Sequence, residues 1–322
     1  MMLARLAENL FWAGRYIERA EDTARMVDVT YHTLLESPPQ ETTHAYTQLL
    51  EVLHLTGAYE ASGGGDRAIT PEDVCAFLVR DPGNAGSIVS SISYARENAR
   101  SVRELISSEL WEAVNHLHFT LRARDLDADL ADQPFELFRI VKQSCQTVSG
   151  VALETMPRDD AWRFLTLGRQ LERAEMTCRL LNVRFSQLVD YSAPVAFHHW
   201  IAVLKSASGL EAFRKRYRAS MDPSEVVEFL LLAPDFPRSV RFALETAERQ
   251  LDHLGGRTGR ATRLLGRTRA SLQYRDVVEL MDEGLHPFLD QLQDEVAAVA
   301  DAVATEFFRQ SPEGSMYAVA TT

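Results

Sequence analysis

Two stretches of this sequence carry the same arginines and glutamates at the same spacing. Residues 14–29 read GRYIERAEDTARMVDV and residues 168–183 read GRQLERAEMTCRLLNV, with nine of the sixteen aligned positions identical. Guanidinium and carboxylate groups can form ion pairs, an arginine can hold a carboxylate or phosphate through two parallel hydrogen bonds, and a glutamate can act as a general acid or base. The repeated residues are therefore the candidates for function.

The candidate site residues form two matching sets of five, one in each copy. The sets are Arg15, Glu18, Arg19, Glu21 and Arg25 in the first copy, and Arg169, Glu172, Arg173, Glu175 and Arg179 in the second. On an α-helix, which turns by about 100° per residue, the small and apolar side chains of each copy gather on one face and the charged set gathers on the other. We therefore predict two helices that each carry one charged face.

These charged faces allow three interpretations. The first is a solvated surface with ion pairs inside each helix. The second is a buried ion network between crossing helices, which fixes register rather than adding stability. Its expected pairs are Glu18 with Arg169 or Arg173, and Glu172 with Arg15 or Arg19. The third is a central cleft in which the arginines bind an anion and Glu18 or Glu172 acts as an acid or base.

A glycine opens each copy, Gly14 in the first and Gly168 in the second. Glycine inside a helix costs about 1 kcal/mol relative to alanine. Because both copies keep glycine at the same point, we expect another backbone or a ligand to approach closely there.

Helical periodicity dominates the chain, and no stretch shows the alternation of a β-strand. The two copies lie inside the longest expected helices, residues 3–36 and 160–190. Shorter helices are expected over residues 42–59, 87–107, 109–124, 135–154, 196–207, 210–218, 239–254, 258–281 and 286–309. Thr70 and Asp222 each precede a proline and are typical helix N-caps. We expect a polar connection over residues 124–134, a weak point at Gly266, and a disordered tail over residues 311–322.

A second match supports an internal duplication. Phe77-Leu78, Pro82 and Ser87-Ile88 resemble Phe229-Leu230, Pro234 and Ser239-Val240 at an offset of 152, against 154 for the charged copies. We therefore predict an all-α, duplicated multi-helix bundle. It would be a single domain over residues 1–310, with repeats of about 1–155 and 156–310 related by a pseudo-two-fold axis.

Composition narrows the class of protein. The chain has 322 residues, 46% of them hydrophobic, and a net charge of −12, which argues against nucleic-acid and anionic-membrane partners. No uncharged apolar run reaches the roughly 18 residues of a transmembrane helix. Arg5 and Glu8 interrupt the apolar N-terminal pattern, unlike a signal peptide. Three separated cysteines, none in a CxxC, are typical of buried thiols in a reducing compartment. We expect a cytoplasmic protein.

Familiar metal and cofactor motifs do not point to a site, and we expect neither a metal nor a cofactor. Glu51 and His54 form a lone ExxH, whereas a helical di-iron centre needs two. The sequence contains no GxxxxGK[ST], GxSxG, HExxH or dinucleotide fingerprint. Seven arginines between Arg249 and Arg275 form a basic cluster, which either docks an acidic partner or balances the acidic last helices.

Five separated segments resemble the bacterial alpha-E family, an all-helical family named for a Glu-Arg motif. The segments are MLARLAENLFWAGRYIERAEDTARMVD, SISYARENARSVRELISSELWEAVN, FLTLGRQLERAEMTCRLL, FLLLAPDFPRSVRFAL and EGLHPFLDQL. They occur in the expected order and cover about residues 2 to 310. The family's Glu-Arg pair falls on Glu18-Arg19, with Glu172-Arg173 as its counterpart in the second half.

The resemblance implies a role beside other proteins. Family members are similar in gene context to systems that contain a circularly permuted ATP-grasp ligase and a transglutaminase-like protein, and they can be fused to the ligase. That context implies ATP-dependent amide-bond formation, in peptide synthesis or modification, with the ligase as partner. The paired arginine and glutamate helices would recognise an anionic peptide or partner. The expected function is an accessory or recognition subunit of such a system. Two alternatives stay open: an enzyme that uses Glu18 or Glu172, and a purely structural scaffold.

Overall fold

The computed structural model describes residues 2–34, 39–64, 69–188, 193–218, 221–255 and 259–309. These residues form α-helices and short π-helical turns joined by loops, with no β-strand in the ranges described, and the all-α prediction is confirmed. The expected disordered tail, residues 311–322, lies outside the described residues.

The first half of the chain begins with the long helix that carries the first charged copy. Its helices are α1 (Ala4–Thr33), α2 (Pro39–Val52), α3 (Thr56–Tyr59) followed by the turn η1 (Glu60–Gly64), α4 (Pro71–Val79), α5 (Ile88–Ser101), α6 (Ser108–Arg122), α7 (Leu126–Asp132) and α8 (Pro134–Thr155).

The second half begins with the long helix that carries the second copy. Its helices are α9 (Asp160–Leu188), α10 (Ala193–Ser206), α11 (Leu210–Tyr217), α12 (Pro223–Val227) followed by η2 (Glu228–Leu232), α13 (Val240–Leu254), α14 (Arg260–Gln273), α15 (Val277–Glu283) and α16 (Leu285–Val303) followed by η3 (Ala304–Phe308).

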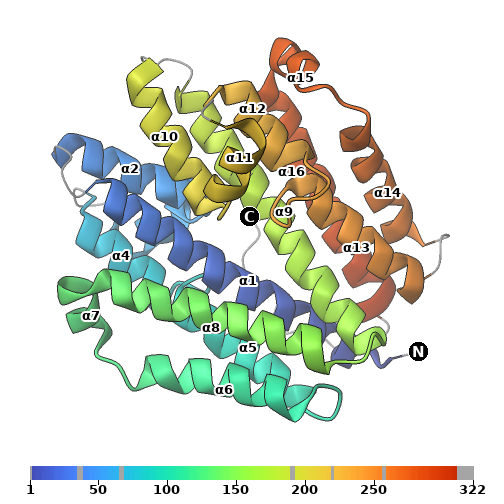
Figure 1. Ribbon diagram of the computed structural model, residues 1–322. Coiled ribbons are helices and arrows are strands. Elements are labelled where there is room, and N and C mark those ends of the chain that lie inside the picture. The colour runs from blue at the N-terminus through green and yellow to red at the C-terminus, as the bar shows by residue number, and fades with distance from the viewer. Residues whose placement is uncertain are drawn as a thin grey trace.

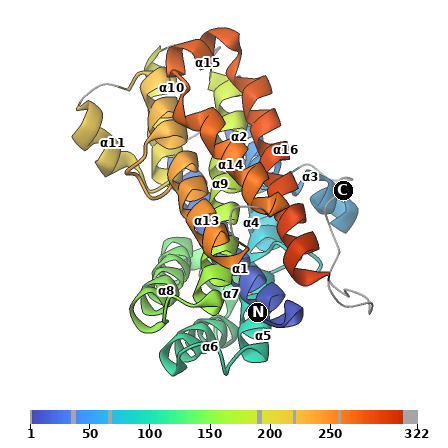
Figure 2. The same cartoon turned by 90° about the vertical axis from the view of Figure 1, so that its right-hand side faces the viewer.

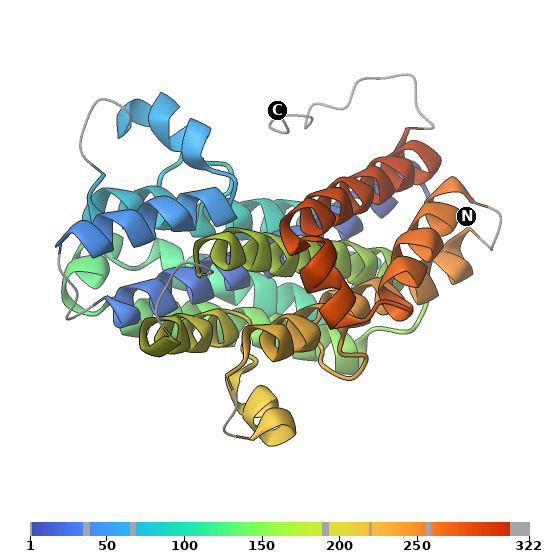
Figure 3. The ribbon, with the colours of Figure 1, turned by 90° about the horizontal axis from the view of Figure 1, so that it is seen from above.

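Helices α1 and α9 lie side by side at the centre of the molecule and start on the same side of it (Figure 1). The other helices surround them in matching order: α5 and α8 pack on α1, and α13 and α16 pack on α9. The next layer also matches, because α6 covers α5 and α8 just as α14 covers α13 and α16. Figures 1 and 2 show these two groups on opposite sides of the central pair. Helix α11 projects from the body, as Figure 3 shows from above.

Helix starts in the two halves use the same caps. The hydroxyls of Ser87 and Ser239 accept the backbone N–H three residues later, at the starts of α5 and α13. Thr70 and Asp222, the predicted caps, do the same work for α4 and α12. A side-chain acceptor at this position satisfies a backbone N–H that the helix leaves unpaired. Matching caps and matching packing order are what a duplicated chain would give, and the duplication itself stays an interpretation.

Three expected elements were placed wrongly. The single helix expected over 42–59 is two helices, because α2 ends at Val52 and α3 begins at Thr56. The segment 124–134 is not only a connection, since it contains α7, whose first turn is capped by the Asp125 carboxylate. The expected helix over 258–281 is two helices: α14 ends at Gln273, and Asp276 caps a new helix, α15. The weak point at Gly266 is not a break. The side-chain caps Asp125 and Asp276 set the starts of α7 and α15, and hydrophobic periodicity alone does not predict them.

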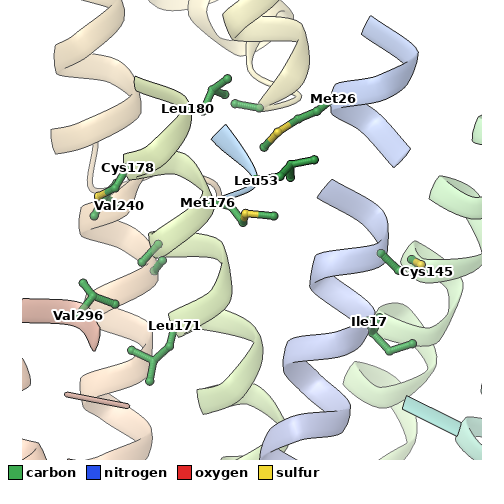
Figure 4. Close-up of a cluster of buried hydrophobic side chains, with 14 of the residues drawn as sticks. Ile17, Met26, Leu53, Cys145, Leu171, Met176, Cys178, Leu180, Val240 and Val296 are labelled. Atoms are coloured by element: carbon green, nitrogen blue, oxygen red, sulfur yellow. The ribbon is translucent and has the colours of Figure 1, made fainter. Parts of the chain in front are cut away.

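The hydrophobic core runs on both sides of the central helices. Figure 4 shows Ile17 of α1 beside Cys145 of α8, and Leu171 of α9 facing Val240 and Val296. All of these side chains are buried. Further along, Met26 and Met176 fill the space where the ribbons of α1 and α9 separate (Figure 4). The two halves therefore share one continuous core.

A search of the described residues for helices that could cross a membrane found no candidate.

Candidate functional site

Helices α1 and α9 meet backbone to backbone at the two glycines. A Cβ atom on Gly14 would lie 2.1 Å from the carbonyl oxygen of Leu165, and one on Gly168 would lie 2.0 Å from that of Phe11. Both distances are far inside van der Waals contact, so no larger residue fits without moving a helix. The predicted approach of another backbone is confirmed. The contact is reciprocal, because each glycine meets the residue three positions before the other glycine.

Beyond this contact, one group of charged side chains surrounds Glu172; we call it the Glu172 cluster. Arg15 Nε donates to Glu172 Oε2 at 2.6 Å, and Arg19 Nε donates to Glu172 Oε1 at 2.6 Å. Arg15 also donates through Nη2 to Glu175 Oε2 at 2.7 Å. Arg179 donates to the same Glu175 oxygen at 3.4 Å. Two arginines of α1 therefore hold one buried glutamate of α9.

A second group, the Glu18 cluster, is the reverse arrangement. Arg173 of α9 donates to both carboxylate oxygens of Glu18 on α1, at 2.6 and 2.8 Å. Such a two-point pair is the strongest geometry for arginine and carboxylate. Glu18 is fully buried, as is Glu172 in the first cluster.

Arg238, a residue outside both copies, completes the Glu18 cluster. Its guanidinium donates to Asp22 at 2.5 Å, Glu21 at 2.6 Å and Glu18 at 3.1 Å. Arg238 lies directly before the cap of α13. Its backbone is fixed on α9, because the Arg238 carbonyl accepts from Thr177 Oγ1 at 3.1 Å. Arg25 also reaches Glu21, at 2.5 Å.

The two clusters differ at two positions that change together. At the offset of 152, Arg238 corresponds to Gly86, which has no side chain to insert. At the offset of 154, its partner Asp22 corresponds to Met176, which has no charge to pair. The second half supplies an arginine where the opposite long helix supplies an additional carboxylate. The exchange pairs the additional carboxylate Asp22 with the additional arginine Arg238.

These pairs set the charge of the two motif glutamates. Burial alone raises the pKa of Glu18, but Arg173 and Arg238 outweigh burial and bring that pKa to about 2. Burial likewise raises the pKa of Glu172, and Arg19 and Arg15 outweigh it, giving a pKa of about 2. Both carboxylates therefore stay ionised at neutral pH with their oxygens occupied by arginines.

Asp22 behaves in the opposite way. Burial raises its pKa to about 7, helped by the nearby carboxylates Glu18 and Glu21, although Arg238 acts to lower it. Three carboxylates crowd around one inserted arginine in this cluster. A proton on Asp22 relieves that crowding.

Arg169 is the exception among the ten predicted residues. It corresponds to Arg15 but makes no hydrogen bond or ion pair within the described part of the chain, and its Nε is buried without an acceptor. Burial lowers the pKa of Arg169, and Arg173 lowers it further, to about 10. The counterparts of the Arg15 acceptors are Glu18 and Glu21, and Arg238 occupies both.

The structure thus brings nine of the ten predicted residues into two clusters between the halves and leaves Arg169 beside them. The interpretation as a solvated face is wrong, because Glu18 and Glu172 are 0% exposed. Both halves of the ion-network prediction are observed: Glu18 meets Arg173, and Glu172 meets Arg19 and Arg15.

Sequence reasoning missed Arg238 and left Asp22 outside the candidate set. Arg238 lies in the segment FLLLAPDFPRSVRFAL, which was singled out only for its resemblance and its apolar matches. The signal that could have found both residues is the paired departure from the repeat, Asp22 against Met176 and Arg238 against Gly86. The first copy has an additional carboxylate, Asp22, and the second half has an additional arginine, Arg238, that pairs with it.

The remaining polar features of the sequence do not join this network. No group of three or more His, Cys, Asp or Glu side chains in the described ranges is placed to hold a metal ion. Cys75, Cys145 and Cys178 are buried free thiols, and burial raises the pKa of each. In the basic cluster of α13 to α15, Arg269 pairs with Glu248 and Arg275 with Glu283, so part of it is balanced internally.

The fold and this site define a class of protein: an all-helical body whose two halves are joined by buried glutamate–arginine pairs of its two longest helices. The chain belongs to the Alpha-E family, described as a predicted alpha-helical domain with a conserved ER motif, whose model matches residues 2–308. The dipeptides Glu18-Arg19 and Glu172-Arg173 fit that description.

Relatives of the chain are found in mycobacteria. Over 274 residues it is 29% identical to an uncharacterized protein of Mycobacterium bovis and 29% identical to one of Mycobacterium tuberculosis. The alignment covers 79% of this chain and 30% of each relative, so the chain corresponds to less than a third of those longer proteins. No solved structure matches the chain.

Proposed function

We propose that this chain is an accessory or recognition subunit of an ATP-grasp-dependent amide-ligase system, in which the Glu-Arg motif joins the two halves of the subunit. The observation that carries the proposal is the burial and full pairing of both motif glutamates. Carboxylates paired in this way hold the subunit in the shape that a partner protein would bind. The bond-forming chemistry would come from the partner, a circularly permuted ATP-grasp ligase, as the family resemblance implies.

The length of the mycobacterial relatives supports a role beside other domains. In each of them the region similar to this chain is 30% of the protein, so most of the polypeptide is additional sequence. A helical body that occurs within larger chains is suited to act together with what it is joined to.

A reconstitution experiment tests the proposal. The chain and the circularly permuted ATP-grasp ligase of the same genome would be co-purified, and ADP release would be followed with the ligase alone and with the chain added. We expect a complex that survives gel filtration and a several-fold rise in ADP release in the presence of an acidic peptide. No complex and no change in ADP release would refute the role.

The alternative of an enzyme acting through Glu18 or Glu172 is less well supported, because arginines occupy both carboxylates. A Glu18→Gln variant separates the two ideas. If Glu18 were an acid or base, activity would vanish while the folded fraction stayed unchanged. Under our proposal, any loss of activity follows the loss of folded protein. The purely structural alternative predicts a folded chain that has no effect on the ligase.

A further inference from the structure

An apolar cavity lies against α1 and α9, next to the glycine contact. Its volume is about 40 Å³, and side chains of α1, α5, α6, α8 and α9 line it. Most of the lining is aliphatic, including Ile17, Val102 and Val148. Ile106 and Ser149 of this lining are only half-buried, so the cavity reaches towards the surface beside them.

The charged residue in the wall of this cavity is Arg169, the arginine without a partner. Arg169 is half-buried, and its Nε is fully buried without an acceptor, whereas a buried polar atom is nearly always paired in a native protein. The neighbouring carboxylates Glu18 and Glu21 attract Arg169 but form no hydrogen bond with it, and Arg173 and Arg238 hold Glu18. The guanidinium therefore lacks the anion that its counterpart Arg15 has in Glu172 and Glu175.

The whole centre of the protein carries an excess of positive charge. The two clusters and Arg169 contain seven arginines: Arg15, Arg19, Arg25, Arg169, Arg173, Arg179 and Arg238. Their carboxylates number five: Glu18, Glu21, Asp22, Glu172 and Glu175. A bound anion beside Arg169 would reduce this excess at the point where the arginine is unpaired.

We propose that this cavity binds a small monoanionic carboxylate with a short, branched aliphatic group, the carboxylate on Arg169 and the aliphatic group among the aliphatic side chains. The planar guanidinium presents parallel N–H donors that match a carboxylate. The apolar lining disfavours a strongly hydrated dianion such as free phosphate, which would need more donors than one arginine offers. The small volume limits the apolar group to a few carbon atoms. This inference does not depend on the ligase partner.

Calorimetric titration of the full chain tests the site. The probes are isobutyrate and isovalerate, each compared with its neutral amide, which has the same shape without the charge. We expect the carboxylates to bind at least tenfold more tightly than the amides, because a charge-assisted pair in an apolar setting is lost with the amide. Equal affinity of acid and amide, or no binding of either, would overturn the proposal.

Three variants locate the binding. Arg169→Met removes the cation and keeps the bulk, and Ala152→Val fills the cavity; both should abolish carboxylate binding. Arg163→Gln is the matched control, since Arg163 lies on the same helix but pairs with Asp160 near the surface, and it should bind as the unmodified chain does.

Methyl NMR gives a readout that does not require any variant to fold. Carboxylate titration should shift the methyl signals of Ile17, Val102 and Val148, which line the cavity, and leave those of Val183 and Val299 unchanged. Shifts confined to the second pair, or carboxylate binding retained by a folded Arg169→Met variant, would place the ligand elsewhere and contradict the assignment.

Discussion

Arg15 and Arg169 occupy the same place in the two copies of the motif, yet only one of them is paired. Arg15 bridges Glu172 and Glu175, whereas Arg169 borders an apolar cavity with its Nε unsatisfied. Identical residue types on identical helical positions thus end in different electrostatic roles. The difference arises outside the motif, in the insertion of Arg238 on one side only.

The comparison shows how a repeated element can hold two halves together and still differ locally. The reciprocal parts, namely the glycine contact and the Glu18 and Glu172 pairs, fix how α1 lies on α9. The non-reciprocal pair, Arg238 with Asp22, leaves Arg169 without a part in fixing the two helices. Five predictions test this division, from the largest expected effect to the smallest.

Replacing either crossing glycine should have the largest effect. The added Cβ of Gly14→Ala or Gly168→Ala would meet a backbone carbonyl oxygen at about 2 Å, so the helices must separate and the paired charges with them. Overpacking against backbone and loss of buried pairs together imply a loss of roughly 5 kcal/mol or more in the free energy of unfolding. Urea denaturation followed by circular dichroism measures it.

Gly150→Ala is the matched control for this prediction. Gly150 lies inside α8, and a Cβ there would meet nothing within 4 Å. Alanine should stabilise that position by about 0.5–1 kcal/mol. If Gly14→Ala behaved like Gly150→Ala, the close contact of the two halves would be wrong.

Removing a motif glutamate should have the next largest effect. Glu172→Gln leaves the buried Arg15 and the half-buried Arg19 without their shared anion, and breaking a buried pair costs about 3–5 kcal/mol. Glu245→Gln is the control, because the Glu245 pair with Arg241 on α13 is partly exposed and worth about 0–1 kcal/mol. A cost for Glu172→Gln no larger than that of the control would show that the cluster contributes nothing to the fold.

The pairs also predict how stability depends on pH. The pKa values of Glu18 and Glu172 are about 2 in the folded protein against an ordinary value of 4.5, so their stabilisation is complete above pH 4.5 and is lost as pH falls through 2. The size is on the order of 3 kcal/mol for each glutamate. Denaturation curves recorded from about pH 5 to about pH 2 would measure this loss of stability.

A Glu172→Gln variant should show only the part of this acid-induced loss that belongs to Glu18. Asp22 does not contribute to the pH dependence of stability below pH 3.8, its ordinary pKa. Its folded pKa is raised, so its own effect on stability lies between pH 3.8 and about pH 7. If the variant lost as much stability as the unmodified chain over this range, Glu172 would not be an anchored carboxylate.

Much of this arrangement could be read from the sequence. The type, spacing and repetition of the charged residues predicted the crossing pairs, and the shared glycines predicted a close contact, because both follow from helix geometry alone. Arg238 could not be predicted in the same way. It comes from a connection between helices, and its insertion depends on how the chain returns to α9 through the Thr177 contact. The lack of a partner for Arg169 follows from that insertion and was invisible for the same reason.

The asymmetric residues should respond as a unit. Arg238→Gly leaves Asp22, Glu18 and Glu21 short of one cation, with an expected cost of about 3 kcal/mol. Adding Asp22→Met reproduces the combination found at the Glu172 cluster, Gly86 with Met176, and should recover about 1–2 kcal/mol of that loss. A double-mutant cycle measures the coupling. Strictly additive effects would mean that the paired departure from the repeat is accidental.

The smallest effect is expected for Arg169→Met, which is compared with Arg15→Met. Arg15→Met removes two buried ion pairs and should cost several kcal/mol, about as much as Glu172→Gln. Arg169→Met removes a half-buried cation that has no partner among the described residues, and replacing such a charge by an apolar side chain of similar length should change the free energy of unfolding by less than about 1 kcal/mol or increase it. Urea denaturation of the two variants measures how much more the free energy of unfolding depends on Arg15 than on Arg169. A large loss in Arg169→Met would mean that this arginine also holds the fold and that the two copies are equivalent after all.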